Sequence, residues 1–165
     1  MEMSAEKEYP PLTEIKEDVQ TLRLISPAYA GREGELTAVL QYVFQSIVFG
    51  EQGNTAASEK ILKIAVSEMR HLEILGTMIT KLGAPPVFTA CPPYPVGYYS
   101  AACVNYAKTP RQMLCADICA EENAISQYEH ILCRLKNPTV AAVISRIIED
   151  EKEHLKTFNQ LLSEL

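Results

Sequence analysis

Glutamate followed three residues later by histidine occurs twice in this sequence, as Glu68-x-x-His71 and Glu151-x-x-His154. Residues three apart in an α-helix lie on nearly one face, so each pair can present a carboxylate and an imidazole to the same point. A donor set of carboxylate oxygen and imidazole nitrogen suits iron or manganese, whereas calcium sites are usually all oxygen. The spacing therefore predicts two metal-binding turns on two different helices.

A second pattern precedes each motif. Glu35 is followed by Tyr42 and Glu121 by Tyr128, so the two halves of the chain each supply one glutamate helix and one Glu-x-x-His helix. Four such helices predict a bundle whose core holds four carboxylates and two imidazoles. Buried carboxylates are costly as bare charges, and two divalent cations would cancel them. The predicted ligands of two iron or manganese ions are Glu35, Glu68, His71, Glu121, Glu151 and His154.

The third of these helices offers two adjacent glutamates, Glu121 and Glu122. Helical spacing places Glu121 on the apolar stripe that includes Leu114, Ile118 and Ile125, and Glu122 on the cysteine-containing stripe beside it, so we expect Glu121 to face inward. His130 falls on about the opposite side from Glu121 and is expected to face solvent. One Glu-x-x-His alone would be weak evidence for a metal, because glutamate is abundant here.

Four further residues are candidates for hydrogen bonds to the ligands. Asp117 and Asp150 are placed to accept the second ring N–H of the histidines, which would fix the histidine tautomers. The first half has Gly31 and Ser67 instead, which suggests two inequivalent metal positions. Tyr42 and Tyr128 are placed to hydrogen-bond the ligand carboxylates of their own helices, although tyrosines at such positions often only fill the core.

Composition excludes several classes of protein. The chain has 165 residues and 47% hydrophobic content, which fits one domain, and its net charge of −6 argues against nucleic acid. No apolar run is long enough to span a membrane, and residues 1–20 contain no apolar signal core. We therefore expect a cytoplasmic protein without a membrane partner. Five cysteines form no C-x-x-C pair, which favours reduced, buried thiols over disulfides.

The positions of the helices follow from the helical periodicity of apolar residues and from the glycines and prolines that interrupt it. We expect an N-terminal extension over 1–25, with a short helix near 12–24, and an all-α four-helix bundle over 26–165. Ser26-Pro27 predicts the start of a first helix over 27–49. A second helix is expected over 55–82, a third over 110–136 opened by a Thr109–Gln112 capping box, and a fourth from Pro138 onward. The proline-rich stretch 84–108 predicts a long crossover between the second and third helices, with a short helix near 98–107.

With these helices in place, the motifs resemble those of the ferritin-like superfamily of dimetal carboxylate proteins. The first pair of helices, with GELTAVLQY and SEMRHLEILGTMITKLG, is similar to manganese catalases and their spore-coat relatives; the second pair, with MLCADICAEENAISQY and IIEDEKEHL, is similar to bacterioferritin and rubrerythrin. The resemblance implies a ferritin-like four-helix bundle and the same six ligands. Ala124 stands where rubrerythrins have a further carboxylate. Met69 occupies the position of a bacterioferritin haem ligand, but haem is not expected.

The resemblance also implies a function. We expect a dimetal oxidoreductase that acts on hydrogen peroxide or dioxygen, like a peroxidase or catalase, with an external electron donor as a possible partner. Cage-forming ferritins have a further C-terminal helix, and the sequence stops at Leu165 after the fourth, so we expect a small homo-oligomer. The alternatives are a non-enzymatic iron-binding or storage protein of the ferroxidase type, and a structural coat or assembly protein whose metal site stabilises the bundle.

Overall fold

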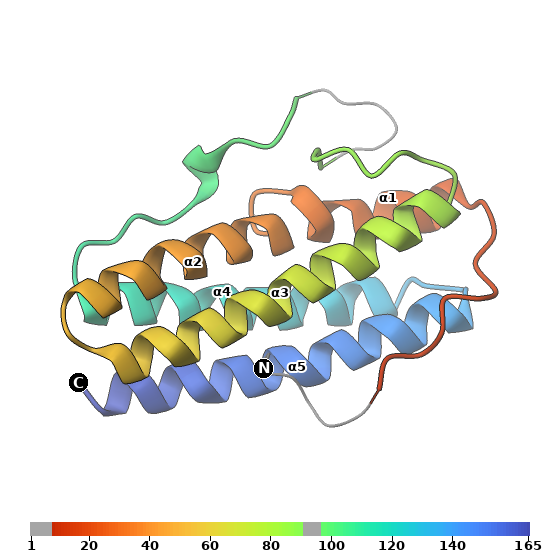
Figure 1. The fold of residues 1–165 in the computed structure, drawn as a ribbon. Coiled ribbons are helices and arrows are strands. Elements are labelled where there is room, and N and C mark those ends of the chain that lie inside the picture. The colour runs from red at the N-terminus through yellow and green to blue at the C-terminus, as the bar shows by residue number, and fades with distance from the viewer. Residues whose placement is uncertain (1–7, 91–96) are drawn as a thin grey trace.

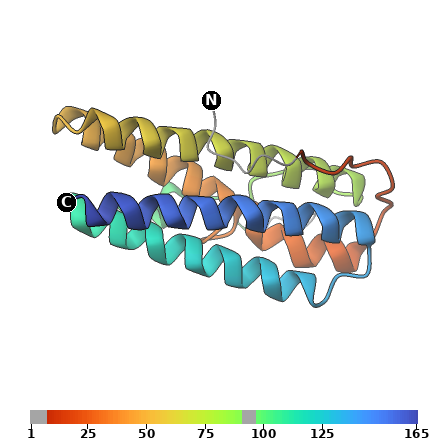
Figure 2. The same ribbon diagram turned by 90° about the horizontal axis from the view of Figure 1, so that it is seen from below.

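Five α-helices make up nearly all of the regular structure in the computed structural model, which describes residues 8–90 and 97–165. They are α1 (Val19–Ala30), α2 (Glu35–Glu51), α3 (Thr55–Lys81), α4 (Pro110–Leu132) and α5 (Pro138–Ser163), with a single 3₁₀ turn, η1 (Ala101–Cys103), before α4. The α2–α3 hairpin packs against the α4–α5 hairpin, while α1 and α2 occupy successive parts of one side of the bundle (Figures 1 and 2). The predicted all-α four-helix bundle is confirmed.

Three helices begin at the capping residues that the sequence predicts or allows. Thr109 accepts a hydrogen bond from the backbone N–H of Gln112, and Asn137 accepts from the N–H groups of Thr139 and Val140. Helix α3 begins after Asn54 and ends before Gly83, whose φ of 100° lies in the left-handed region that favours glycine. The predicted second, third and fourth helices are therefore present, although α4 ends four residues before the predicted Lys136.

The prediction for the first helix is wrong. Asp18 rather than Ser26 caps the helix that contains Pro27, and Ser26 instead donates to the carbonyl of Leu22 inside α1. The helix starts earlier because Leu22 and four later apolar residues of α1 are buried in the core, so packing overrides the preference of proline for a first turn. Instead of running on to residue 49, the chain breaks at 31–34 and starts again as α2.

Glycine makes this break possible. A Cβ on Gly34 would lie 2.5 Å from the carbonyl oxygen of Ala28, and one on Gly31 would collide with the carbonyl of Pro27. Only a residue without a side chain allows the backbone to pass this close. The consequence is that Glu35 becomes the first residue of α2, directly after Gly34.

The connector between α3 and α4 joins opposite ends of the bundle, as predicted for a crossover (Figure 1). The predicted short helix near 98–107 is reduced to the single turn η1. The backbone N–H of Asn105 donates to Gln41 Oε1, which ties the end of the connector to α2. Cys91 and the prolines among residues 91–96 lie outside the described residues.

Two apolar clusters fill the two ends of the bundle. One joins α1 with the C-terminal half of α3 and the N-terminal half of α5, and the other joins α2 with the N-terminal half of α3 and the C-terminal half of α5. Between them lies a buried polar layer that includes Ser67, Glu68 and His71 of α3 and Asp150, Glu151 and His154 of α5. Burial of both clusters supplies the hydrophobic stabilisation that offsets the cost of this layer.

Candidate metal centre

Six buried side chains in the polar layer form two overlapping groups. Each group offers four ligand atoms that all lie within 4.8 Å of one another. The His71 group consists of Glu35, Glu68, His71 and Glu151, and the His154 group of Glu68, Glu121, Glu151 and His154. Glu68 and Glu151 belong to both groups, so the two metal sites share two carboxylates. The structure thus brings together all six residues that the spacing predicts, and each is at most 5% exposed.

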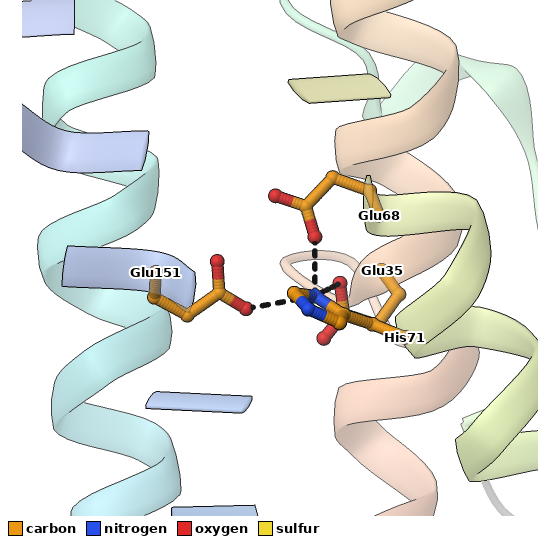
Figure 3. A group of neighbouring side chains, drawn as sticks. All are labelled: Glu35, Glu68, His71 and Glu151. Carbon is orange, nitrogen blue, oxygen red and sulfur yellow. Dashed lines mark hydrogen bonds and ion pairs between the residues drawn. The ribbon is translucent and has the colours of Figure 1, made fainter. Parts of the chain in front are cut away.

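Each histidine points its Nδ1 atom at the shared carboxylates. His71 Nδ1 lies 2.8 Å from Glu68 Oε2, 3.2 Å from Glu151 Oε1 and 3.7 Å from Glu35 Oε2 (Figure 3). His154 Nδ1 lies 2.9 Å from Glu68 Oε1, 3.0 Å from Glu151 Oε2 and 4.0 Å from Glu121 Oε2. The ring centroids of the two histidines are 5.8 Å apart. The two groups are therefore adjacent and have matching geometry.

The donor atoms fit a metal ion better than they fit one another. A ring nitrogen carries at most one proton, so His71 Nδ1 cannot form good hydrogen bonds to three carboxylates at once. The buried atoms Glu68 Oε1 and Glu151 Oε1 each face a histidine Nδ1 that also lies close to an oxygen of another carboxylate, so one ring N–H cannot satisfy both. A cation at the centre of each group would satisfy all these atoms together. A donor set of carboxylate oxygens with one imidazole nitrogen suits iron or manganese.

Charge in the polar layer supports the same conclusion. Burial and the charges of neighbouring carboxylates raise the pKa of Glu35 and of Glu121 well above the usual value. Burial acts in the same direction on Glu68, but His154 and His71 hold the pKa of Glu68 well below its usual range. Opposed shifts of this kind arise where carboxylates outnumber the positive charges around them. Two divalent cations would match the four carboxylates.

Of the two adjacent glutamates of α4, one points into the bundle and the other points to solvent. Glu121 is buried in the His154 group, whereas Glu122 is exposed, as the apolar stripe predicts. His130 is also exposed, as predicted. The ligand roles assigned to the six inward residues remain predictions, since they concern a bound metal.

Tyr42 and Tyr128 bond the ligand carboxylates across the bundle rather than on their own helices. Tyr42 of α2 donates its hydroxyl to Glu121 Oε1 of α4 at 2.5 Å, and Tyr128 of α4 donates to Glu35 Oε1 of α2. Both tyrosines are 1% exposed. The two hydrogen bonds are reciprocal: a tyrosine of each half of the chain holds a glutamate of the other half.

The two aspartates have different partners. Asp150 Oδ2 lies 3.2 Å from His71 Nε2, on the side of the ring away from the ligand carboxylates. Asp117 was predicted to bond a histidine, but its Oδ1 accepts 2.8 Å hydrogen bonds from the side-chain amides of Gln41 and Gln45. The prediction failed because α2 presents two side-chain amides one turn apart to Asp117, and these occupy the oxygen that was expected to accept from a histidine.

Sequence reasoning missed several residues around the site. Gln41 and Gln45 are polar positions four apart in an otherwise apolar helix, which could have marked them as inward hydrogen-bond donors. Arg146 Nη1 lies 2.7 Å from Asp150 Oδ1, and the i, i+4 spacing of this pair was visible in the sequence. Tyr9 donates its hydroxyl to Asp150 Oδ2. The two residues are 141 positions apart, and no pattern in the sequence predicts their contact.

A cavity of about 180 Å³ leads to the polar layer from the surface. Its inner wall includes all four glutamates of the two groups together with Tyr42 and Tyr128, and its outer wall includes the exposed residues Arg32, Glu33, Cys119 and Asn123. Neither His71 nor His154 lines it. Small molecules can therefore reach the sites from the carboxylate side, between α2 and α4.

The cysteines differ from the prediction in one respect. Cys103, Cys115, Cys119 and Cys133 are free, as expected, but the three on or beside α4 are exposed rather than buried. They occupy the outer stripe of α4 next to Glu122, because the inner stripe is filled by larger apolar residues.

The comparisons with known proteins agree with the fold and the site. The sequence model of the ferritin-like domain family, Ferritin, matches residues 32–165, and the chain belongs to this family. It is a ferritin-like dimetal carboxylate protein with two buried glutamate–histidine metal sites. A search of curated proteins finds no match. No helix in the described part of the chain combines the length and apolarity needed to cross a membrane.

Solved structures with the same fold include two kinds of protein. KatB, a manganese catalase from Anabaena, superposes with a TM-score of 0.84 at 21% identity, over 99% of this chain and 80% of that one. A bacterioferritin with a diiron site from Desulfovibrio desulfuricans gives 0.74 at 24% identity, over 88% of this chain and 79% of that one. Mycobacterium tuberculosis bacterioferritin, BfrA, gives 0.73 at 24% identity over 90% and 87%. These likenesses establish the fold, and the activity has to be argued from the site.

Proposed function

We propose that this protein is a dimetal oxidoreductase that removes hydrogen peroxide. The observation that carries the proposal is the cavity of about 180 Å³ that joins the surface to the carboxylates of both metal groups. A site that only stabilised the bundle would have no need of such an opening. The cavity suits a small polar molecule, because its inner wall combines four carboxylates with two tyrosine hydroxyls.

In this proposal, two iron or manganese ions, when bound, supply the change between divalent and trivalent states. Glu68 and Glu151 belong to both groups and would hold both ions, while Glu35 with His71 would hold one of them and Glu121 with His154 the other. The apolar clusters on both sides of the polar layer keep bulk water out. The substrate enters from the carboxylate side, because the cavity is lined by the four glutamates and by neither histidine.

Proton supply is also available along the cavity. Reduction of one hydrogen peroxide to two waters consumes two electrons and two protons. These come from a second peroxide, which is oxidised to dioxygen, or from an external donor. The hydroxyls of Tyr42 and Tyr128 line the cavity and donate to Glu121 and Glu35, so a proton can be held at those carboxylates close to the substrate.

The test is peroxide consumption by the metal-loaded protein, compared with the same concentration of free Mn²⁺ or Fe²⁺. We expect faster consumption by the protein, and loss of this advantage in Glu121→Ala but not in Glu122→Ala, because only Glu121 faces the metal group. Release of one dioxygen for two peroxides would identify a catalase, and consumption only with an added reductant would identify a peroxidase. Consumption no faster than that of free metal would refute the proposal.

A second candidate function is ferrous iron oxidation with storage, supported by the similarity of the fold to two bacterioferritins. This function predicts a different oligomer size and metal content, because storage requires a large closed shell and many irons per chain. A dimetal enzyme instead holds two metals per chain and needs no closed shell. Iron counting combined with size-exclusion chromatography separates the two functions, and the proposed peroxide chemistry predicts a small homo-oligomer with two metals per chain.

A further inference from the structure

The segment that precedes α1 reaches the back of the metal centre. Residues 8–18 run beside α3 and α5 (Figure 2), where Ile15 is buried in the apolar cluster and the backbone N–H of Asp18 donates to the carbonyl of Leu82 at 3.3 Å. Tyr9 lies at the start of this stretch. Its ring is 6.3 Å from that of His71 between centroids, in an edge-on arrangement. The segment therefore covers the histidine side of the polar layer.

Tyr9 contacts the site through Asp150. Its hydroxyl donates to Asp150 Oδ2, the same oxygen that lies 3.2 Å from His71 Nε2. Arg146 holds the other oxygen, Oδ1, at 2.7 Å, and the guanidinium carbon of Arg146 lies 4.5 Å from the centroid of the Tyr9 ring. Asp150 is fully buried and Arg146 is 2% exposed, so their ion pair is shielded from water, while Tyr9 is half-buried above it.

This arrangement fixes the orientation of one imidazole. With Nε2 on Asp150, the ring of His71 must present Nδ1 to Glu68 and Glu151, which is the orientation that a metal ion would use. A carboxylate held at both oxygens has little freedom to rotate, so its position depends on Tyr9 and Arg146 together.

The two halves of the chain differ at this point. Asp150 precedes the shared ligand Glu151, whereas the corresponding residue before Glu68 is Ser67, which has no carboxylate. The contact of Tyr9 with Asp150 thus belongs to the His71 group. Any effect of Tyr9 should fall on one metal position more than on the other.

We propose that Tyr9 is a positioning residue for the metal bound by the His71 group: it holds Asp150 through its hydroxyl, and Asp150 holds His71. This inference rests on the proposed metal-binding role of the site, but it does not depend on the reaction. It assigns to the segment before α1 a function beyond packing, and it makes the two metal positions unequal in affinity.

The test removes the hydroxyl alone. Tyr9→Phe keeps the ring beside Arg146, and Tyr29→Phe is the matched control, since the Tyr29 hydroxyl donates to the carbonyl of Pro86 away from the metal groups. Each metal-stripped full-length variant is titrated with Co²⁺, whose visible absorption reports the ligands around the ion, in competition with a chelator. We expect Tyr9→Phe to weaken one of the two binding steps by roughly 10- to 100-fold and to alter its absorption band, with the other step unchanged. Tyr29→Phe should match the unmodified protein.

A double-substitution cycle shows whether Tyr9 acts through Asp150. In an Asp150→Asn background, Tyr9→Phe should weaken Co²⁺ binding by a much smaller factor than in the unmodified protein. Two unchanged binding steps in Tyr9→Phe would overturn the inference, and so would an equal loss in both backgrounds. These results are independent of peroxide turnover: an inactive protein with a selectively weakened step refutes the proposed reaction and supports the role of Tyr9.

Discussion

Metal binding should stabilise this bundle strongly, because the polar layer holds four buried carboxylates that oppose one another. A ligand present at 100 times its dissociation constant stabilises the folded state by about 2.7 kcal/mol per site. The two groups together would therefore contribute roughly 5 kcal/mol when both are filled to that degree. In a domain of this size, each kcal/mol raises the melting temperature by about 2–4 °C, so a rise on the order of 10–20 °C is expected.

Thermal unfolding measures this effect directly. The protein is stripped with a chelator at neutral pH and melted with and without Mn²⁺ or Fe²⁺, with helix content followed by far-ultraviolet circular dichroism. His71→Ala removes the nitrogen donor of one group and should retain about half of the metal-induced rise. His130→Ala changes an exposed histidine and should retain all of it.

Two results would refute this reasoning. A melting temperature that does not change at saturating metal would mean that the polar layer does not hold cations. An equal rise in His71→Ala, His130→Ala and the unmodified protein would mean that metal binds elsewhere. Comparison with the variant His154→Ala, which should also lose about half of the rise, checks that both groups contribute.

Three further outcomes follow from the same geometry. Tyr42→Phe removes the hydroxyl that holds Glu121 and should weaken one metal-binding step by roughly 10- to 100-fold, measured by chelator competition. Gly34→Ala places a Cβ 2.5 Å from the carbonyl of Ala28 and should destabilise the protein by about 1–3 kcal/mol in denaturant unfolding, whereas Gly97→Ala, with open space around its Cβ, should not. Burial raises the pKa of Asp117 to about 7, so the folded state holds a proton that the unfolded state loses near pH 4, and this contribution to stability fades as the pH rises from 4 to 7. The metal-free Asp117→Asn variant should therefore gain stability relative to the unmodified protein over that range, and a constant difference would contradict the shifted pKa.

The six side chains that meet in the polar layer could be predicted from the sequence because their signals are local. The spacing of Glu68 with His71, and of Glu151 with His154, needs only the geometry of one helical turn to put both side chains on the same face. The choice of Glu121 over Glu122 likewise needed only the apolar stripe of one helix. Helix starts at Thr109 and Asn137 were predictable for the same reason, since a cap is set by neighbouring residues.

The parts that could not be predicted depend on contacts between distant segments. Tyr9 and Asp150 are 141 residues apart, and residues 8–18 have no helical period that would indicate which surface they cover. The break before Glu35 follows from the close approach of two glycines to carbonyls of the preceding helix, which depends on how α1 packs in the core. Asp117 was on the predicted inner side of α4, but its partners belong to another helix.

The two sides of the polar layer have different structural roles, and the difference follows from which residues cover them. On the histidine side, the buried residues Asp150 and Arg146 and the half-buried Tyr9 hold His71 from behind, and neither histidine lines the cavity. On the carboxylate side, the cavity reaches the glutamates, and each terminal glutamate is restrained by a single tyrosine hydroxyl. A metal centre that reacts with a small substrate needs firm ligands to retain its ions and movable ligands to open a coordination position. Under the proposed function, His71 meets the first need and the glutamates along the cavity meet the second. Substitutions behind His71 should therefore act on metal affinity, and those along the cavity, such as Tyr42→Phe, should act on turnover as well as on metal affinity.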